Sequence, residues 1–173
     1  MSQVIFITGG ARSGKSRLAE GLAEGFGAPL AYIATGEAKD AEMRARIERH
    51  RSRRGTGWHT VEEPYYLAET VKQHDGHFKA MLVDCITLWL TNLLLRFDDR
   101  QKVMDEVALF SASFPSLKTP LILVSSEVGM GIVPENALAR AFRDLAGEAN
   151  ELLAKAADEV YVTFSGLPLK LKG

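Results

Sequence analysis

Residues 9–16 carry the side chains and the spacing that most clearly predict a chemical role. They match the pattern GxxxxGK[ST] and read Gly9, Gly10, Ala11, Arg12, Ser13, Gly14, Lys15 and Ser16. Glycines allow positive φ and a close approach of the backbone, so successive N–H groups can point at phosphate oxygens. Lys15 would reach the β- and γ-phosphates of a nucleotide, and the Ser16 hydroxyl would bind Mg²⁺. A glycine-rich turn that matches by chance is the alternative.

The flanking sequence argues against chance, because it predicts a strand before this loop and a helix after it. Residues 4–8 are an apolar run, and a helix is expected from about residue 16 to 25. Leu18, Leu22 and Phe26 lie four residues apart, so they are expected to form its buried face.

Further apolar runs predict the rest of the sheet. They occupy residues 30–34, 80–85, 121–125 and 159–164 and alternate with helical patterns. Short, continuous apolar runs of this kind predict an α/β fold with a parallel sheet that helices cover on both faces. Residues 58–61 fit either a short edge strand or a loop.

Polar residues follow two of these runs at the carboxyl edge of the predicted sheet, where open α/β sheets bind ligands. Thr35 and Gly36 are candidate nucleotide contacts, although a Thr-Gly turn is also ordinary strand punctuation. Asp84 ends an apolar strand, as in a Walker B segment, where the carboxylate holds Mg²⁺ directly or through water.

The loop over residues 126–136 follows the run at 121–125. Its glycines, with Glu127 and Asn136, predict a mobile polar loop that closes over a substrate. A long helix is expected from Pro134, and Arg140 and Asp144 on one of its faces fit either a surface ion pair or a ligand contact. Its expected core stripe is Leu138, Phe142, Leu145, Ala149, Leu152 and Ala156.

A histidine surrounded by arginines is the second chemical feature. Asp40 can cap a helix that places Met43, Ile47 and His50 on one face, with arginines at 44, 46, 49, 51, 53 and 54 around them. Guanidinium groups favour a nearby polyphosphate and lower the imidazole pKa, which keeps a ring nitrogen available as a nucleophile. Spacing alone leaves two alternatives open: a solvated basic helix and a nucleic-acid patch, the latter without interleaved aromatic residues.

Composition limits the function classes. The 173 residues fit one domain, and the net charge of −1 argues against general nucleic-acid binding. Cys85 is the only cysteine, which excludes a disulfide or a cysteine zinc site within one chain and fits a reducing compartment. His59, His74 and His77 lack metal-ligand spacing. No basic leader or apolar stretch near 18 residues occurs, so we expect a cytoplasmic protein without a membrane partner.

Several longer motifs point to one family. The longest are TGGARSGKSR at 8–17, YIAT at 32–35, EMRARIERHR at 42–51, DCIT at 84–87 and EVGMGIVPEN at 127–136. The shorter ones are Trp58, Glu62, Thr91-Asn92-Leu93, and Phe142-Arg143-Asp144 before Asn150. With these motifs the chain resembles, over nearly its whole length, the bifunctional adenosylcobinamide kinase/adenosylcobinamide-phosphate guanylyltransferases of cobalamin biosynthesis.

The resemblance implies two linked reactions. ATP or GTP phosphorylates the aminopropanol hydroxyl of adenosylcobinamide. His50 then attacks the α-phosphate of GTP, releases pyrophosphate, and passes GMP to adenosylcobinamide phosphate, giving adenosylcobinamide-GDP. A single-activity P-loop small-molecule kinase and a nucleotide-dependent regulatory switch are the alternatives.

The resemblance also assigns residues and assembly. It implies a single three-layer, RecA-like P-loop NTPase domain over residues 1–173, with a mainly parallel sheet, and a homotrimer to which the apolar residues 88–95 would contribute. His50 and Lys15 would be catalytic, and Ser16 and Asp84 would bind Mg²⁺. Glu127, Asn136 and Arg140 are candidate contacts to the corrinoid. The implied nucleotide contacts are Gly9, Gly10, Ala11, Arg12, Ser13, Gly14, Lys15, Ser16, Thr35, Gly36, Arg51, Ser52, Arg53, Arg54, Glu62 and Asp84.

Overall fold

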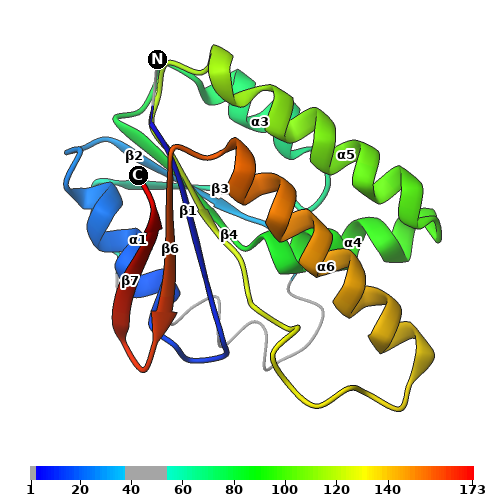
Figure 1. Ribbon diagram of the computed structural model, residues 1–173. Coiled ribbons are helices and arrows are strands. Elements are labelled where there is room, and N and C mark those ends of the chain that lie inside the picture. Colours follow the sequence, from blue (N-terminus) through cyan, green and yellow to red (C-terminus); the bar gives the residue numbers. More distant parts are fainter. Residues whose placement is uncertain (1–2, 38–53) are drawn as a thin grey trace.

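A seven-stranded sheet runs through the computed structural model, which describes residues 3–37 and 54–173 (Figure 1). The strand order is β3-β2-β4-β5-β1-β6-β7, and all neighbours are parallel except β6 and β7. The strands are β1 (Val4–Gly9), β2 (Leu30–Ala34), β3 (Trp58–Glu62), β4 (Ala80–Asp84), β5 (Leu121–Val124), β6 (Glu159–Phe164) and β7 (Leu167–Lys172).

The structure confirms the five expected strands to within one residue at each end, and residues 58–61 lie in the edge strand β3. Strand β7 was not predicted. Ser165 and Gly166 both have positive φ, 50° and 85°, and form the turn of a β6–β7 hairpin. Every residue of β7 is exposed, so its sequence lacks the apolar run that marks the buried strands.

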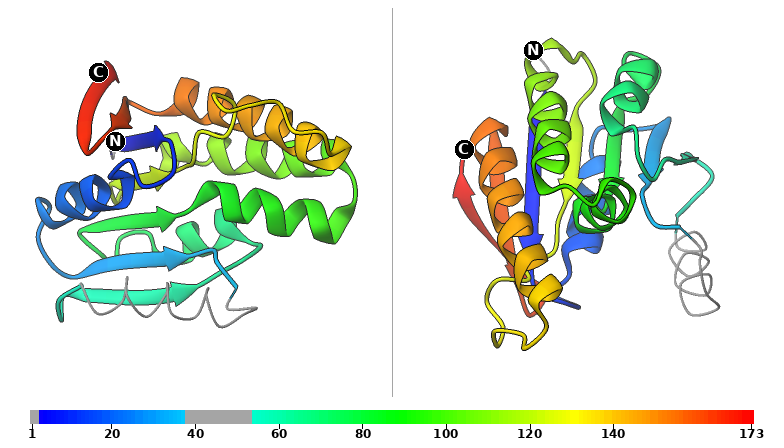
Figure 2. Two further views of the ribbon diagram at one scale, coloured as in Figure 1. Left: turned by 90° about the horizontal axis from the view of Figure 1, so that it is seen from below. Right: turned by 90° about the vertical axis from the view of Figure 1, so that its right-hand side faces the viewer.

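Helices cover the two faces of the sheet unequally (Figures 1 and 2). Helix α1 (Lys15–Glu24) packs on one face, against Ile7, Leu82 and Val124 among other buried side chains. Within the described part of the chain, four helices cover the other face, which holds the larger core. They are α3 (Leu67–His74), α4 (Ile86–Phe97), α5 (Arg100–Ala112) and α6 (Ala137–Ala156). The layers are helix, sheet and helix, as the sequence predicted.

The buried face of α1 differs from the expected one. Ala19 and Ala23 are fully buried, whereas Leu18 and Leu22 are half-buried beside them. Small side chains let the helix backbone approach the sheet closely, and the leucines fill the space at its flanks. The fully buried positions are therefore one residue later along the helix than the predicted leucines.

Helix α6 begins at Ala137 instead of Pro134. Asn136 precedes it, and the Asn136 side chain accepts a hydrogen bond from the Ala139 N–H at 3.0 Å, which caps the helix. The predicted core stripe is correct at its middle but wrong at its ends. Leu138 and Ala156 are exposed, and the buried positions run from Leu145 to Leu153.

The leucine-rich helix α4 does not leave an apolar face on the surface. Trp89, Leu90 and Leu93 are at most 1% exposed and belong to the chain's own core. Among the expected interface residues 88–95, only Leu95 is exposed. Helix α5, over a region without a recognised motif, supplies Val103 and Phe110 to the same core.

Candidate active site

The glycine-rich loop connects β1 to α1 at the carboxyl edge of the sheet. Gly14 has a φ of 99°, in the left-handed region that favours glycine, and helix α1 starts at the next residue. The Lys15 ammonium group turns back across the loop and donates to the Gly10 carbonyl at 2.7 Å. The loop backbone, the helix N-terminus and Lys15 thus converge where a phosphate group would bind.

The β6–β7 hairpin braces this loop. Ser13 Oγ and Thr163 Oγ1 share a buried hydrogen bond of 2.7 Å, and the Gly166 N–H donates to the Ser13 carbonyl at 2.9 Å. A Cβ atom on Gly9 would lie only 2.6 Å from the Thr163 carbonyl oxygen, so this position admits only glycine. The brace could not be predicted from the sequence, because Ser13 and Thr163 are 150 positions apart and no local pattern links them.

We expect Thr163→Val to weaken both the fold and nucleotide binding. The change leaves the buried Ser13 hydroxyl without its partner, which costs about 1–3 kcal/mol of the free energy of unfolding. It also loosens the loop, so the KM for a nucleoside triphosphate should rise. Chemical denaturation and steady-state kinetics measure the two effects, and Thr163→Ser should restore both. An unchanged KM in a destabilised Thr163→Val protein would show that the brace does not position the loop.

Asp84 ends β4, and β5 lies between β4 and β1. Neighbouring strands are about 4.8 Å apart, so Asp84 is on the order of 10 Å along the sheet edge from the phosphate loop. The Tyr32 hydroxyl donates to Asp84 Oδ2 at 3.1 Å. Burial raises the pKa of Tyr32, and the Asp84 carboxylate raises it further, so the phenol stays protonated and orients that carboxylate.

Thr35 is a structural brace in this arrangement. Its side chain is completely buried, and its hydroxyl donates to the Cys85 carbonyl at 2.7 Å and accepts from the Cys85 N–H at 2.8 Å. The Thr35 carbonyl accepts from Asn92 Nδ2 at 2.8 Å. These bonds join the ends of β2 and β4 and fix the backbone beside Asp84. At Gly36, an added Cβ would come within 3.3 Å of Leu88.

Ser16 and Asp84 fit a magnesium ion by their chemistry, since Mg²⁺ prefers oxygen ligands from one or two side chains together with substrate phosphates. Both residues lie at the carboxyl edge of the sheet, Ser16 in the first turn of α1. Within residues 3–37 and 54–173 there is no cluster of three or more His, Cys, Asp or Glu residues that could hold a metal by itself. Bound phosphates would therefore have to supply much of the coordination.

We expect Asp84→Asn to raise the Mg²⁺ concentration needed for half-maximal turnover of a nucleoside triphosphate by about 10- to 100-fold. The amide oxygen can still accept from Tyr32, so the local structure should persist while the negative charge is lost. A Mg²⁺ titration of the initial rate makes the measurement. Asp105→Asn, at an exposed position on α5, is the control. Identical titration curves for Asp84→Asn and the unmodified enzyme would remove Asp84 from the metal site.

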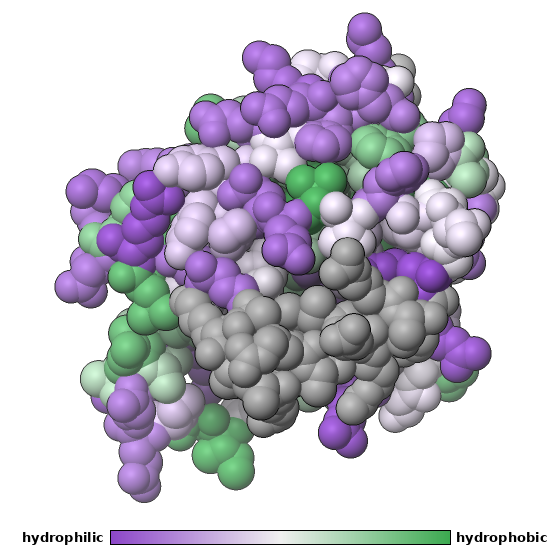
Figure 3. Space-filling view, turned by 180° about the vertical axis from the view of Figure 1, so that it is seen from behind, coloured by the Kyte–Doolittle hydropathy of each residue, from purple (hydrophilic) through white to green (hydrophobic). Residues whose placement is uncertain are grey.

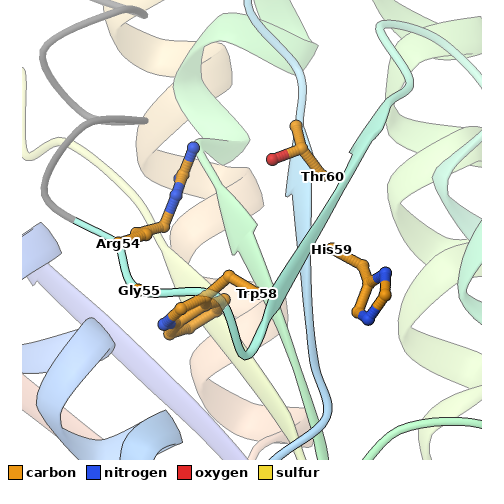
Figure 4. Close-up of a pocket in the computed structure, with 5 residues that line it drawn as sticks. All are labelled: Arg54, Gly55, Trp58, His59 and Thr60. Carbon is orange, nitrogen blue, oxygen red and sulfur yellow. The ribbon is translucent and has the colours of Figure 1, made fainter.

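Arg54 and Trp58 form a second feature, at the amino ends of β2 and β3, where Trp58 Nε1 donates to Glu24 at the end of α1 at 3.4 Å. The Arg54 guanidinium carbon lies 3.3 Å from the centroid of the Tyr32 ring, a cation–π contact. The adjoining cavity has a volume of about 320 Å³. Its lining residues, drawn in Figure 4, are Arg54, Gly55, Trp58, His59 and Thr60. Glu62 is exposed at the end of β3, four strands from β1 and therefore roughly 19 Å away.

The loop after β5 differs in character from the expected polar loop. The Glu127 N–H donates to the Gly9 carbonyl at 2.9 Å, and Glu127 Oε1 accepts from the Gly129 N–H at 2.7 Å. Arg140 bonds to loop carbonyls instead of pairing with Asp144, so the ion-pair prediction is wrong. The tip of the loop is apolar, because Met130, Ile132 and Val133 are exposed there.

Behind the loop, a hydrogen-bonded chain that sequence reasoning missed fixes the end of β5. The Ser126 N–H donates to Thr87 Oγ1 at 2.7 Å, Thr87 Oγ1 lies 3.3 Å from Ser125 Oγ, and Ser125 Oγ donates to Asn150 Oδ1 at 2.6 Å. Ser125 and Asn150 are buried. This chain ties β5, α4 and α6 together between the phosphate loop and Asp84.

The described residues do not include four of the predicted site residues, which are His50, Arg51, Ser52 and Arg53. Of the helix expected over residues 40–54, the structure describes Arg54 alone. The structure therefore brings together the phosphate loop and Asp84 at the carboxyl edge of the sheet. Residues 54–58 lie at the amino ends of β2 and β3, from where the Arg54 guanidinium reaches Tyr32 beside Asp84. The histidine prediction stays untested. Over the two described ranges, no helix is long and apolar enough to cross a membrane.

The comparisons with known proteins agree over nearly the whole sequence. The CobU family model, described as cobinamide kinase / cobinamide phosphate guanyltransferase, matches residues 5–171. The bifunctional adenosylcobalamin biosynthesis protein CobP of Pseudomonas aeruginosa is 47% identical over 167 residues, covering 96% of both chains. The protein CobU of Escherichia coli, with the same description, is 41% identical over 181 residues, covering 98% of this chain and 99% of the relative.

Solved structures with little sequence similarity share the fold. A KaiC-like protein of Pyrococcus horikoshii superposes with a TM-score of 0.50 at 15% identity, covering 92% of this chain and 70% of that one. The P4 protein of bacteriophage phi6, solved with ADP, has a TM-score of 0.51 at 15% identity, covering 96% and 52%. These likenesses confirm a P-loop NTPase fold with a mainly parallel sheet.

Proposed function

This chain belongs to the cobinamide kinase / cobinamide phosphate guanyltransferase family. On that premise we propose which of its residues act in the phosphoryl transfer and which in the guanylyl transfer. It is a bifunctional transferase of adenosylcobalamin biosynthesis, which phosphorylates cobinamide and converts cobinamide phosphate by guanylyl transfer. The observation that carries the assignment of residues is the placement of the phosphate loop and Asp84 at one sheet edge, with only β5 between them.

In the kinase step, the hydroxyl oxygen of cobinamide attacks the γ-phosphorus of the nucleoside triphosphate. The bond from that phosphorus to the β–γ bridging oxygen breaks, and the hydroxyl loses its proton. The loop N–H groups and Lys15 would bind the phosphate oxygens and offset the charge on the departing diphosphate. Mg²⁺, held by Ser16 and Asp84, would supply further charge neutralisation.

In the guanylyl step, a ring nitrogen of His50 attacks the α-phosphorus of GTP. The bond to the α–β bridging oxygen breaks, and pyrophosphate leaves from the same phosphate loop. A phosphate oxygen of cobinamide phosphate then attacks the guanylyl phosphorus, and the bond to His50 breaks. Glu62 and the Arg54 guanidinium support this reading. Glu62 ends β3 on the far side of Asp84 from the loop, where the nucleoside end of GTP would extend, and the guanidinium lies over Tyr32, which bonds to Asp84.

Labelled GTP tests the proposal. The enzyme is incubated with Mg²⁺ and GTP labelled at the α- or at the γ-phosphate, without a corrinoid, and then run on a denaturing gel. We expect label on the protein from α-labelled GTP alone, labile to acid and stable to base. Addition of cobinamide phosphate should discharge it into a soluble product. Label from the γ-position, or none, would leave only a kinase or a nucleotide switch.

We also propose a homotrimer of single catalytic domains, each spanning residues 1–173, in the cytoplasm. The family resemblance supports the trimer, but α4 is buried in its own chain and offers little contact area. The exposed leucines of β7, at positions 167, 169 and 171, supply an alternative apolar surface. Light scattering coupled to gel filtration measures the assembly, and a monomeric mass at micromolar concentration would contradict the trimer.

A further inference from the structure

The loop after β5 exposes more apolar surface than a solvent-facing loop requires. The exposed fractions are 77% for Met130, 98% for Ile132, 60% for Val133 and 61% for Leu138 at the start of α6. Single exposed apolar residues are ordinary, whereas four within residues 130–138 form a local group that favours a ligand. The lower left of Figure 3, where this loop lies, carries hydrophobic side chains beside hydrophilic ones.

Polar contacts, and not these apolar side chains, hold the loop in place. Arg143 donates to the Gly129 carbonyl, and Arg140 donates to the carbonyls of Pro134 at 2.9 Å and Glu135 at 2.6 Å. Asn136 caps the helix that follows. The backbone is thus fixed from the side of α6, while the apolar side chains face solvent and contribute little to folding.

A cavity of about 680 Å³ with several charged residues in its lining lies next to the apolar group. Gly129 and Ala141 line it, so it adjoins Met130 along the chain and Leu138 one turn along α6. Its charged lining residues are Arg100, Arg143, Asp144, Glu148 and Glu151, and Arg100 pairs with Glu148. The cavity thus offers both hydrogen-bond donors and acceptors.

The loop leaves the sheet beside the phosphate loop. Strand β5 is the neighbour of β1, and the Glu127 N–H bonds to the Gly9 carbonyl, the first residue of the phosphate loop. Figure 1 shows both loops at the lower end of the sheet. A large substrate bound on the loop after β5 can therefore present one arm to the reacting phosphate while its bulk stays outside the sheet edge.

We propose that Met130, Ile132, Val133 and Leu138, with the adjoining cavity, bind the corrinoid substrate in both steps. A corrinoid is a broad macrocycle with apolar faces and a rim of amide arms. The apolar group matches a macrocycle face, and the cavity matches amides, which need donors and acceptors. This inference rests on the proposed function, and it names the substrate site that the nucleotide residues leave unassigned.

The test uses the full-length enzyme with Ile132→Ser and Val133→Ser combined. We expect the KM for cobinamide and the dissociation constant from equilibrium dialysis to rise about 10- to 100-fold, from the loss of apolar contact. The KM for ATP and the rate of self-guanylylation without a corrinoid should be unchanged. The matched control is Leu109→Ser on α5, which removes an exposed leucine elsewhere and should leave all four quantities unaltered.

Unchanged cobinamide affinity in the loop variant would overturn the proposal. A fall in its molecular mass in solution with unchanged cobinamide affinity would also overturn it and would assign the loop to a subunit contact. Failure of the proposed function is seen separately, as absence of self-guanylylation in the unmodified enzyme.

Discussion

Replacement of Lys15 by alanine is expected to abolish both transfers. The two reactions differ in the phosphorus attacked, but both expel a phosphate-containing leaving group, and the same ammonium group would bind it. Loss of one charged donor from such a site lowers kcat by about 10²- to 10³-fold. We therefore expect losses of this size in the phosphorylation of cobinamide and in self-guanylylation. Initial rates of the two reactions, assayed separately, make the measurement.

The controls separate chemistry from folding, because Lys15 is largely buried and bonds to Gly10. Lys15→Met keeps the length of the side chain and should be as inactive as Lys15→Ala while melting at the unmodified temperature. Lys155→Ala removes a lysine that pairs with Glu151 on the exposed face of α6 and should retain full activity. Full activity of Lys15→Ala in either assay would show that the two reactions do not share the phosphate loop.

Replacement of His50 by alanine is expected to separate the two activities. The variant loses the nitrogen that attacks the α-phosphorus, so covalent labelling and guanylyl transfer should fall by about 10³-fold or more. The kinase step does not pass through this histidine, and its kcat and KM should stay within about twofold of the unmodified enzyme. Gel labelling and a coupled kinase assay measure the two outcomes on one preparation.

His59→Ala is the matched control for this variant. His59 is exposed on the edge strand β3 and packs beside Phe78. Its replacement should leave the labelling intact, because the Arg54 and Trp58 side chains are unchanged. Label that persists in His50→Ala but disappears in His59→Ala would move the nucleophile to the other histidine and contradict the motif-based assignment.

Local sequence pattern predicted much of the fold because buried parallel strands leave a strong local signal. Runs such as residues 80–83 are apolar throughout, since both faces of the sheet are covered. Strand β7 left no such signal, because all of its residues are exposed. The pattern placed the stripe of α1 on its leucines, but close packing against the sheet selected Ala19 and Ala23 instead.

Residues of the candidate site also differ in whether the sequence alone predicts their roles. The phosphate loop and Asp84 could be predicted because each has a compact motif at the end of a strand. The roles of Thr35 and Arg140 could not, because each depends on a partner that only the folded chain supplies. The Thr35 hydroxyl is occupied by Cys85, and Arg140 binds the carbonyls of Pro134 and Glu135.

The hydrogen bond between Ser13 and Thr163 affects when the nucleotide site can form during synthesis of the chain. Ser13 is made early, but its partner Thr163 follows 150 residues later. At typical translation rates this interval lasts roughly 8–30 s. The central strand β1 also pairs with β5 and β6, both from the later part of the chain. The phosphate loop is thus translated well before the strands β5 and β6 that flank β1, and the nucleotide site is among the last parts of the fold to be completed.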